Sequence, residues 1–590
     1  MNNFESQKEF RLKSGSKILD LIKKFSITEK TIFGILVIIV IISTLFMIQR
    51  INDFFMIEIP THGGELREGV IGLPHTINPV LSITDVDRDL TSLIYSGLMK
   101  YDGENLTTDL AESFDISDDG LTYTFKIRPN VYFHDNRPLT AEDVAFTIQK
   151  VQTPALKSPR RADWNNVTVS VISSEEIRFT LKQPYSPFIN NTTIGIIPKH
   201  IWNDLNDDQF VFSEYNVKPI GAGPYKFNTI KRDADGIPEE INVKSWKKHQ
   251  PRPPYIDSIT FIFFPDSDKA VSAIEKGAID SLVFTSPRQA SGFLSDCTSN
   301  SSCKDKYSII STPLSRIFGV FFNQSNNPVL ADRIVRQALD ISIDKKMLTQ
   351  KILNGYGIPV YGPLPKIENS AEKIQVESPN MALATSILEK AGWKKNSQSG
   401  IYEKKNSKNV LQILSFDIFT ADTPDLKETA FVVRDTWNAL GAQVNVKIFE
   451  SGELYQNIIR PRKYDALLFG QQIGKDRDLY AFWHSSQRNS PGLNVSLYTN
   501  SKADSLLDTI RSTNDKDLLK SKYAELDTII KADIPAVFLY SPSFIYLTPS
   551  SLKNMNADFK LKNISTQTDR WNSVSDWFIT TEKVWKMFAK

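Results

Sequence analysis

The stretch that decides the fold spans residues 111–144 and reads AESFDISDDGLTYTFKIRPNVYFHDNRPLTAEDV. Within it, apolar and polar residues alternate over 121–128, and this period of two predicts a half-buried strand. The sequence DNRP at 135–138 predicts a turn. Thr140 and Asp143 then have the spacing of a capping box, which predicts that a helix begins here. A strand, a turn and a helix in succession indicate a mixed α/β chain.

The same stretch resembles the signature region of the family 5 extracellular solute-binding proteins of ABC transporters. The dipeptide- and oligopeptide-binding proteins are the best known members, and nickel-binding proteins belong there too. The resemblance extends over about residues 63 to 590. Four further stretches agree with it in the same order: GELREG at 64–69 followed by NP at 78–79, PIGAGPYKF at 219–227, VRQALDISID at 335–344, and DIP at 533–535 with LY at 539–540.

The resemblance implies a type II periplasmic-binding-protein-like fold, with two α/β lobes joined by a hinge and a ligand enclosed between them. Lobe I is then expected over 62–308 and 545–590, with an extra subdomain at about 101–218. Lobe II is expected over 309–544. Helical and strand patterns also interleave over 330–470, which independently predicts an α/β lobe there.

A loop in lobe II is the first part of the expected ligand site. Peptide-binding members carry an aspartate on this loop, after a buried strand, and it pairs with the ligand's ammonium because a buried lone charge is costly. Here the loop at 470–478 reads GQQIGKDRD. One alignment puts Ile473 at the aspartate's position, and a shifted one puts Asp476 there. Gln471 and Gln472 suit a neutral ligand such as a blocked peptide, an amide or a sugar, or are solvated loop residues.

Three more residues complete the expected site. Asn323 follows the apolar run at 318–322 and resembles the family's F-N position near the hinge. It either contacts the ligand or fixes a crossover turn. Phe482 and Trp483 either wall the cleft, where aromatic faces suit ligand packing, or pack in the core.

The sequence contains none of the common catalytic motifs: G-x-x-x-x-G-K-[ST], H-E-x-x-H, G-x-S-x-G and G-x-G-x-x-G are all absent. We interpret His134 and Asp135 as turn residues rather than a catalytic pair. We therefore expect no enzyme activity, cofactor or metal. Cys297 and Cys303 have no histidine nearby, so we expect them to form a disulfide outside the cell rather than a metal site.

An uncharged apolar stretch at 31–48 reads TIFGILVIIVIISTLFMI. As a helix it spans roughly 27 Å, close to the thickness of a hydrocarbon core. The preceding residues 1–30 hold seven basic and four acidic residues, which predicts a cytoplasmic N-terminus. We expect a membrane anchor at 31–49 and a tether at 50–61. A cleaved signal peptide and a buried helix are the alternatives, although no A-x-A-like cleavage site follows.

Composition excludes several other classes of protein. The chain of 590 residues is 41% hydrophobic and 23% charged, as in ordinary globular proteins rather than disordered or collagen-like ones. A net charge of +2 gives no basic surface for nucleic acid. We expect a monomeric, extracellular receptor that captures a peptide or similar small solute and delivers it to the permease subunits of an ABC importer. A surface sensor or scaffold without transport, and an extracellular hydrolase, are the alternatives.

Overall fold

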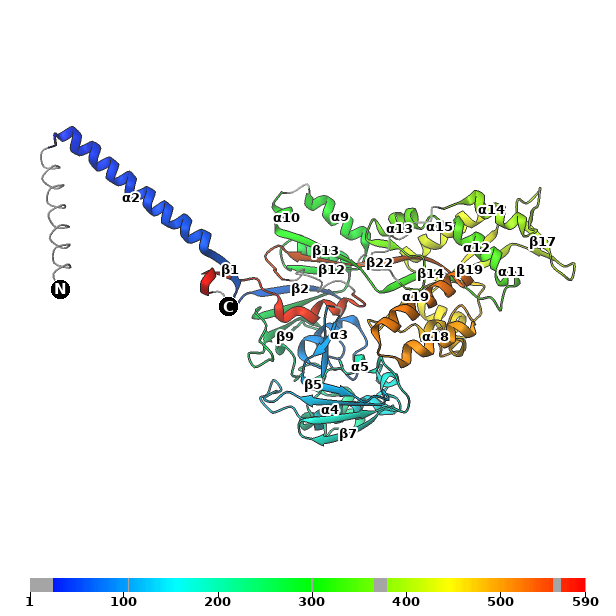
Figure 1. Ribbon diagram of the computed structural model, residues 1–590, viewed down its shortest axis with the longest axis horizontal. Coiled ribbons are helices and arrows are strands. Elements are labelled where there is room, and N and C mark those ends of the chain that lie inside the picture. The colour runs from blue at the N-terminus through cyan, green and yellow to red at the C-terminus, as the bar shows by residue number, and fades with distance from the viewer. Residues whose placement is uncertain (1–24, 104, 299–300, 365–378, 555–563, 589–590) are drawn as a thin grey trace. The chain divides into compact units, whose positions relative to one another are not determined.

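The computed structural model describes residues 25–103, 105–298, 301–364, 379–554 and 564–588 (Figure 1). The chain divides into a small unit, Met1–Thr61 with Thr580–Lys590, and a large unit, His62–Ile579. Residues 1–24 hold most of the basic segment expected in the cytoplasm and lie outside the described residues.

The small unit is a long helix followed by a two-stranded ribbon. Helix α2 (Ile27–Phe55) contains the predicted span at 31–49, and by length and composition it is able to cross a membrane. The predicted tether at 50–61 is regular structure, because the helix continues past residue 50. Strand β1 (Met56–Pro60) then pairs antiparallel with β23 (Thr581–Trp585).

Lobe I of the large unit is built on a mixed sheet. Strand β2 lies between β11 and β12 and pairs in parallel with both. Its elements are β2 (Glu65–Ile71), α3 (Asp85–Ile94), β9 (Tyr225–Arg232), β10 (Pro238–Ser245), β11 (Ser258–Phe264), α8 (Ser267–Glu275), β12 (Ser281–Phe284), α9 (Pro287–Thr298), α10 (Ser301–Lys306), β13 (Tyr307–Pro313) and the 3-10 helix η6 (Gln567–Asp576).

The stretch at 111–144 lies in a subdomain of lobe I, where β5, β6, β8 and β7 form an antiparallel sheet. The predicted strand is β6, with Tyr123 and Phe125 buried. The predicted capping box is confirmed, because the Thr140 backbone N–H donates to Asp143 Oδ2 at 2.9 Å. The elements are β3 (Met99–Asp102), β4 (Asn105–Thr108), β5 (Ala111–Ile116), β6 (Thr122–Ile127), α4 (Ala141–Gln152), η1 (Pro154–Leu156), η2 (Arg161–Trp164), β7 (Thr168–Ser173), β8 (Glu176–Thr180), α5 (Phe188–Asn191), α6 (Lys199–Trp202), α7 (Asp207–Phe212) and η3 (Glu214–Asn216).

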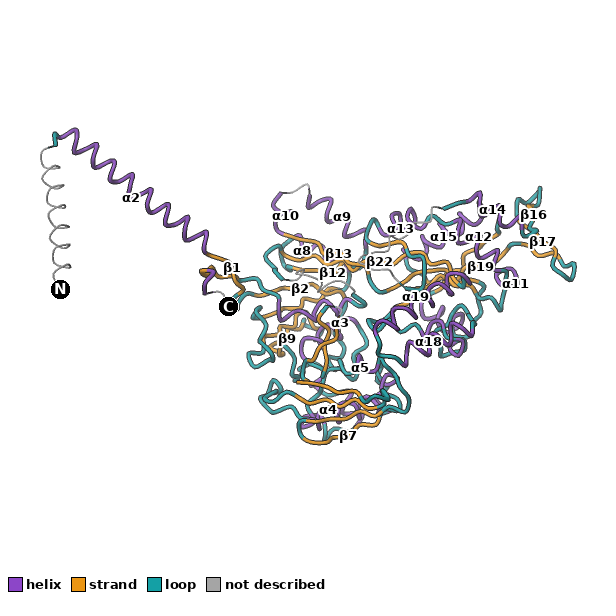
Figure 2. Tube along the Cα trace, in the orientation of Figure 1, coloured by secondary structure: helices purple, strands orange, loops and turns teal. Residues whose placement is uncertain are grey.

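Lobe II is a sheet covered by helices on both faces (Figure 2). Trp437 packs in the core on the side of α12, α13 and α15, and Leu507 in the core on the side of α18 and α19. The strands are β14 (Arg316–Phe322), β15 (Gly357–Pro359), β16 (Lys394–Lys395), β17 (Tyr402–Lys405), β18 (Leu411–Ile413), β19 (Ser415–Ala421), β20 (Gln443–Phe449), β21 (Ala466–Gln472) and β22 (Ala536–Pro549). The helices are α11 (Pro328–Ala331), α12 (Arg333–Ser342), α13 (Lys345–Leu353), α14 (Met381–Lys390), α15 (Pro424–Leu440), α16 (Ser451–Glu453), η4 (Leu454–Ile459), α17 (Tyr480–Trp483), η5 (Ser485–Gln487), α18 (Ser501–Ser512) and α19 (Lys516–Asp533).

Two chain segments cross side by side between the lobes. The 14-residue strand β22 pairs with β14 in lobe II and with β12 and β13 in lobe I. The connection from β13 to β14 runs beside it, where Leu314 N–H donates to the Pro542 carbonyl at 2.8 Å and Ser541 Oγ donates to the Leu314 carbonyl at 2.6 Å. The connection from β13 to β14 therefore passes between the lobes near residue 314.

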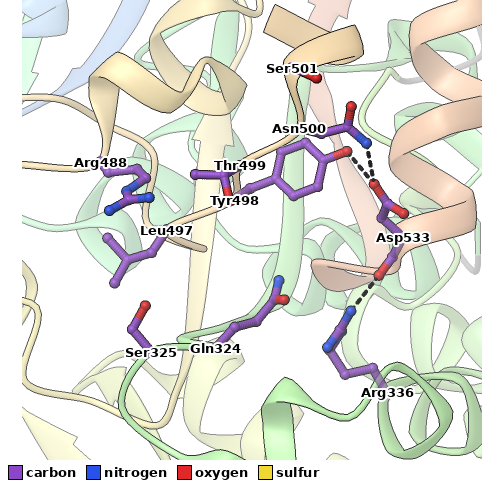
Figure 3. A pocket seen from close by; sticks show the side chains of 10 residues that line it. All are labelled: Gln324, Ser325, Arg336, Arg488, Leu497, Tyr498, Thr499, Asn500, Ser501 and Asp533. Carbon is purple, nitrogen blue, oxygen red and sulfur yellow. Dashed lines mark hydrogen bonds between the residues drawn. The ribbon is translucent and has the colours of Figure 1, made fainter.

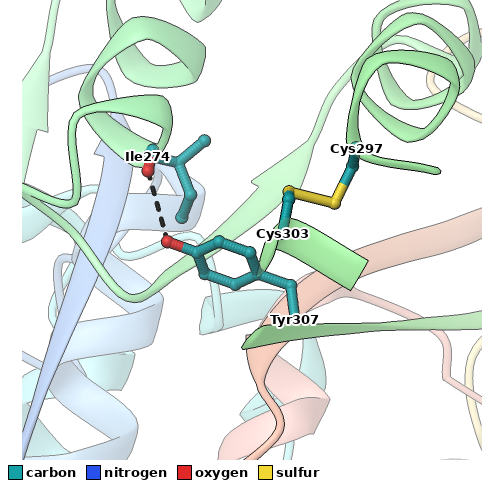
Figure 4. The surroundings of a disulfide bond; sticks show 4 residues. All are labelled: Ile274, Cys297, Cys303 and Tyr307. Atoms are coloured by element: carbon teal, nitrogen blue, oxygen red, sulfur yellow. Dashed lines mark hydrogen bonds between the residues drawn. A yellow bond between two sulfur atoms is a disulfide. The ribbon is translucent and has the colours of Figure 1, made fainter. Parts of the chain in front are cut away.

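Cys297 on α9 and Cys303 on α10 form the expected disulfide, with a Cα–Cα distance of 5.1 Å (Figure 4). Beside it, the Tyr307 hydroxyl donates to the Ile274 carbonyl at 3.2 Å. Cys297 is buried in a small hydrophobic core of lobe I, and Cys303 packs against that core.

A fully buried ion cluster ties α3 to η6 inside lobe I. The Arg570 guanidinium lies 2.7 Å from Asp89 Oδ2 and 2.9 Å from Glu68 Oε1. Tyr546 also donates to Glu68 at 2.7 Å, and Thr568 donates to Asp89 at 2.6 Å. Both carboxylates are thus hydrogen-bonded as well as ion-paired, as buried charges need to be.

Candidate functional site

The two lobes enclose a cavity of about 490 Å³ beside the crossing strands. Lobe I contributes α3, the end of β12 and the segment at 565–567, while lobe II contributes β14, the end of β21 and the N-terminus of α15. The cavity has the volume of a typical small-molecule site. Both lobes therefore contribute to its wall beside the two crossing segments.

Stacked aromatic rings form one wall of the cavity. Phe318 on β14 and Tyr540 on β22 are opposite each other in register, and their ring centroids are 5.4 Å apart. The Tyr540 hydroxyl is 2.9 Å from Thr429 Oγ1 on α15, which fixes the ring. On β21, a Cβ atom at Gly470 would lie 2.7 Å from the Phe318 ring. A glycine at this position therefore leaves room for the ring to lie flat against the strand.

Charges of both signs line the cavity. Arg88 on α3 pairs with Asp85 at 3.2 Å, and Arg316 on β14 donates to Gln472 Oε1 at 3.0 Å. Asp425, in the first turn of α15, has no cation within ion-pair distance in the part of the chain that the structure describes. Partial burial raises the pKa of the Asp425 carboxyl, while Arg288 opposes the shift. Among the described residues that line the cavity, Asp425 is therefore an acidic group without an ion-pair partner.

The lobes also touch at the borders of the cavity. On one side, Arg288 of α9 pairs with Glu428 of α15 at 3.3 Å. On another, Gln472 Nε2 donates to the Ser565 carbonyl at 3.3 Å. The two lobes thus contact each other on two sides of the cavity.

A family model of the bacterial extracellular solute-binding proteins, family 5, matches residues 105–491. This chain belongs to that family. It is 30% identical over 504 residues to the oligopeptide-binding protein AppA of Bacillus subtilis, covering 84% of this chain and 89% of AppA. The predicted family membership is therefore confirmed, and the chain is a solute-binding protein.

Solved structures give the same fold. The structure of B. subtilis AppA in complex with a nonapeptide matches with a TM-score of 0.65 at 27% identity, covering 88% of this chain and 100% of that one. The structure of the substrate-binding protein CtaP from Listeria monocytogenes matches with a TM-score of 0.72 at 23% identity, over 88% and 99% of the two chains. The predicted two-lobed α/β fold is confirmed.

The predicted loop of this solute-binding protein contributes one residue to the cavity lining, Gln472. Gln471 points to the opposite face of the sheet, where its side chain is buried and its amide has no hydrogen-bond partner among the described residues. Ile473 is also buried, in the core of lobe II, and its N–H donates to the Ser315 carbonyl at 2.7 Å. The position that one alignment gives to the ligand-binding aspartate is therefore an apolar core position.

Asp476 lies outside the cavity lining, near the contact between lobe II and the subdomain. Burial raises the pKa of its carboxyl, while the hydrogen bond from the Asp478 N–H opposes the shift. The neighbouring cation Arg511 pairs instead with Asp478 at 2.7 Å. Close by, Ser186 N–H of the subdomain donates to the Arg511 carbonyl at 2.8 Å. Asp476 is thus enclosed where two parts of the molecule meet.

The other three predicted residues belong to the framework of lobe II. Asn323 is buried, accepts from the N–H groups of Ser325 and Asn326 and donates to the Arg462 carbonyl at 3.0 Å. It therefore fixes the turn after β14. Trp483 is fully buried in the core beside α18, and Phe482 packs against that core. None of the three lines the cavity.

A second polar cavity, of about 540 Å³, opens on lobe II alone (Figure 3). Arg336 donates to the Asp533 and Ile534 carbonyls at 2.7 and 2.8 Å. The Asp533 carboxylate in turn accepts from the Tyr498 hydroxyl and from Asn500 Nδ2. These groups satisfy one another and join α12 to the end of α19, so we assign them a structural role.

Several cavity residues were missed by sequence reasoning. Arg88, Arg316 and Asp425 stand in three separate parts of the chain and match no motif. Tyr540 lies in the late LY motif, and Phe318 lies in the apolar run before Asn323, but both signals indicate a strand rather than a cavity wall. Only the crossing of the strands brings these residues together.

Proposed function

We propose that this chain captures a peptide or similar small solute between its lobes and delivers it to the permease subunits of an ABC importer. The cavity lined by both lobes at their crossing is the observation that carries the proposal. AppA, an oligopeptide-binding protein, supports a peptide as the ligand class. The chain acts as a monomeric receptor and not as an enzyme.

The cavity chemistry suits a peptide. A peptide carries an ammonium group, a carboxylate and amides that both donate and accept hydrogen bonds. We assign the ammonium to Asp425, which has no ion-pair partner among the described residues, and the carboxylate to the Arg316 side. Apolar side chains of the ligand pack on Phe318 and Tyr540. Asp425 thus pairs with the ligand's ammonium in place of the loop aspartate of other peptide-binding members, because the corresponding loop position here is the buried Ile473.

Helix α2 holds this receptor in the membrane as an uncleaved anchor, with the binding unit outside the cell. The support comes from the small unit, where β23 pairs with β1 directly after the helix. In addition, Trp585 Nε1 donates to Asn52 Oδ1 in the last turns of α2 at 2.9 Å. Removal of the helix would destroy this contact. Tethering also raises the effective concentration of receptor near its permease.

The ligand assignment is tested by calorimetry on the full chain in lipid nanodiscs, with peptides of several lengths and their N-acetylated forms. We expect saturable binding of a free peptide, and about a tenfold loss of affinity on Asp425→Asn or on acetylation of the ligand. The two changes together should cost little more than either alone, because they remove the same contact. Asp422→Asn is the matched control, since Asp422 pairs with Lys427 at 2.6 Å outside the cavity lining.

Equal losses with free and acetylated peptides would contradict the role of Asp425. No saturable binding of any peptide, together with binding of a sugar or a nickel complex, would contradict the ligand class. Delivery is tested by uptake of the bound peptide in cells that lack the chain. Unchanged uptake would leave a solute sensor as the function.

A further inference from the structure

Exposed apolar side chains gather in the small unit just beyond the membrane-spanning part of α2. Phe54 is 82% exposed, Met587 75% and Phe588 72%. Single exposed apolar residues are common on protein surfaces, whereas a group of them marks a contact surface. Trp585 is also exposed, and Phe55 stacks on it with ring centroids 6.0 Å apart.

The direction of the ribbon brings these residues to the end of the helix. Strand β1 leads away from α2, and β23 runs antiparallel to it, back toward the helix. Met56, the first residue after α2, is opposite Trp585 in the register. The short helix η7 (Lys586–Phe588) therefore follows at the level of the last turns of α2. Two segments more than five hundred residues apart thus meet at one level along the anchor.

Composition at this level matches a membrane interface. The apolar stretch ends at residue 48, and Arg50 and Asp53 follow. The aromatic residues come next, which is where Trp and other aromatic side chains gather in membrane proteins. Lys583 and Lys586 are exposed beside them and suit anionic lipid headgroups.

We propose that residues 585–588, together with Phe54 and Phe55, insert into the headgroup and acyl-chain boundary of the outer membrane face. The lipid bilayer is the occupant because the apolar group directly continues a helix that crosses it. This inference rests on the proposed anchoring by α2. Both chain connections to the large unit, after Thr61 and before Thr580, then leave from a ribbon that is seated on the membrane.

Labelling of the full chain in vesicles of phosphatidylcholine and phosphatidylglycerol tests whether residues 585–588 insert into the membrane. The two native cysteines form a disulfide, so Met587→Cys gives a single site for an environment-sensitive fluorophore. Thr581→Cys, at the far end of β23 and roughly 13 Å from Trp585 along the strand, is the matched control. We expect shallow spin-labelled lipids to quench the label at 587 at least about twofold more than the label at 581. Aqueous iodide should show the reverse preference.

Equal iodide quenching at both positions would overturn the proposal. A label at 587 that is shielded from iodide but not quenched by lipid would also overturn it, in favour of contact with a second copy of the chain. Carbonate extraction and the intact mass of the membrane-bound chain test the anchor separately. If a chain of full mass stays in the membrane while its label at 587 faces water, the insertion of residues 585–588 is contradicted, but the anchoring by α2 is not.

As a second readout, trypsin cleavage after Lys583 and Lys586 should be slow in vesicles. The double variant Met587→Ser and Phe588→Ser should be cleaved about fivefold faster in vesicles, because burial of two apolar side chains is lost. In detergent, which removes the bilayer, trypsin should cleave this variant and the wild type at similar rates. Equal cleavage rates of both proteins in vesicles would contradict insertion.

Discussion

Carboxylates are treated in opposite ways in two regions of the large unit. In lobe I, Glu68 and Asp89 are fully buried and bonded to Arg570, with Tyr546 and Thr568 completing their hydrogen bonds. At the borders of lobe II, Asp425 and Asp476 have no cation within ion-pair distance in the described part of the chain. The ion pairs of Glu68 and Asp89 hold α3 and η6 together, whereas the carboxylates of Asp425 and Asp476 are not paired with a cation of the described chain.

The two regions adjoin on α3. Arg88 lines the cavity, whereas the next residue, Asp89, points into the buried ion cluster. The same Arg570 also donates to the carbonyl of Gln567, which lines the cavity. The buried ion cluster therefore positions one wall of the cavity that contains Asp425.

The largest expected effect comes from breaking the buried ion cluster of Glu68, Asp89 and Arg570. Arg570→Met leaves two carboxylates buried without a cation and should lower the free energy of unfolding by about 3–5 kcal/mol. Urea unfolding monitored by tryptophan fluorescence measures it. The loss should be smaller at about pH 4.5 than at about pH 8, because burial raises the pKa of Glu68 and of Asp89 and protonation removes their charge.

The exposed ion pair of Arg160 and Asp163 provides the control for that variant. Arg160→Met should change the free energy of unfolding by less than about 1 kcal/mol, since exposed pairs contribute little. A similar loss for both arginine variants would show that burial does not distinguish the two pairs.

A smaller effect is expected from the aromatic wall. Gly470→Ala places a methyl group against the Phe318 ring and should displace it from Tyr540. We expect a loss of about 1–2 kcal/mol in the free energy of unfolding and weaker ligand binding. Gly292→Ala is the control, because a Cβ atom there meets nothing within 4 Å. Unchanged ligand affinity in Gly470→Ala would show that the stacked rings of Phe318 and Tyr540 do not contact the ligand.

The smallest effect concerns Asp476 and has the opposite sign. Its folded-state pKa is raised, so its contribution favours the folded state below the unfolded pKa and is lost as pH rises through the folded value. Asp476→Asn should therefore stabilise the protein by about 1 kcal/mol at neutral pH and show no gain at about pH 3. Thermal melts across this pH range measure it, and destabilisation at neutral pH would indicate an ionic partner for Asp476.

Local elements were predictable from the sequence, and the cavity was not. Strand β6 and the capping box at Thr140 depend on residues adjacent in sequence, and both are present. Gln472, at the end of a recognisable buried strand, lines the cavity, and its contact with a ligand stays a prediction. Arg316 and Asp425 meet only after two strands cross between lobes, and no sequence spacing records that event. The pairing of β1 with β23 joins the two ends of the described chain and has no local signal either.

The two crossings between the lobes lie side by side, joined through Leu314, Ser541 and Pro542. Two adjacent crossings define a line, so we expect the lobes to rotate relative to each other about a single axis. Atoms near the axis, such as those of Gln472, move little during such a swing, whereas atoms at the far rim travel in proportion to their distance. The chemistry read close to the axis is therefore nearly independent of the opening angle. We expect the length of ligand that fits between the lobes to depend on how far the outer edges of the lobes move apart.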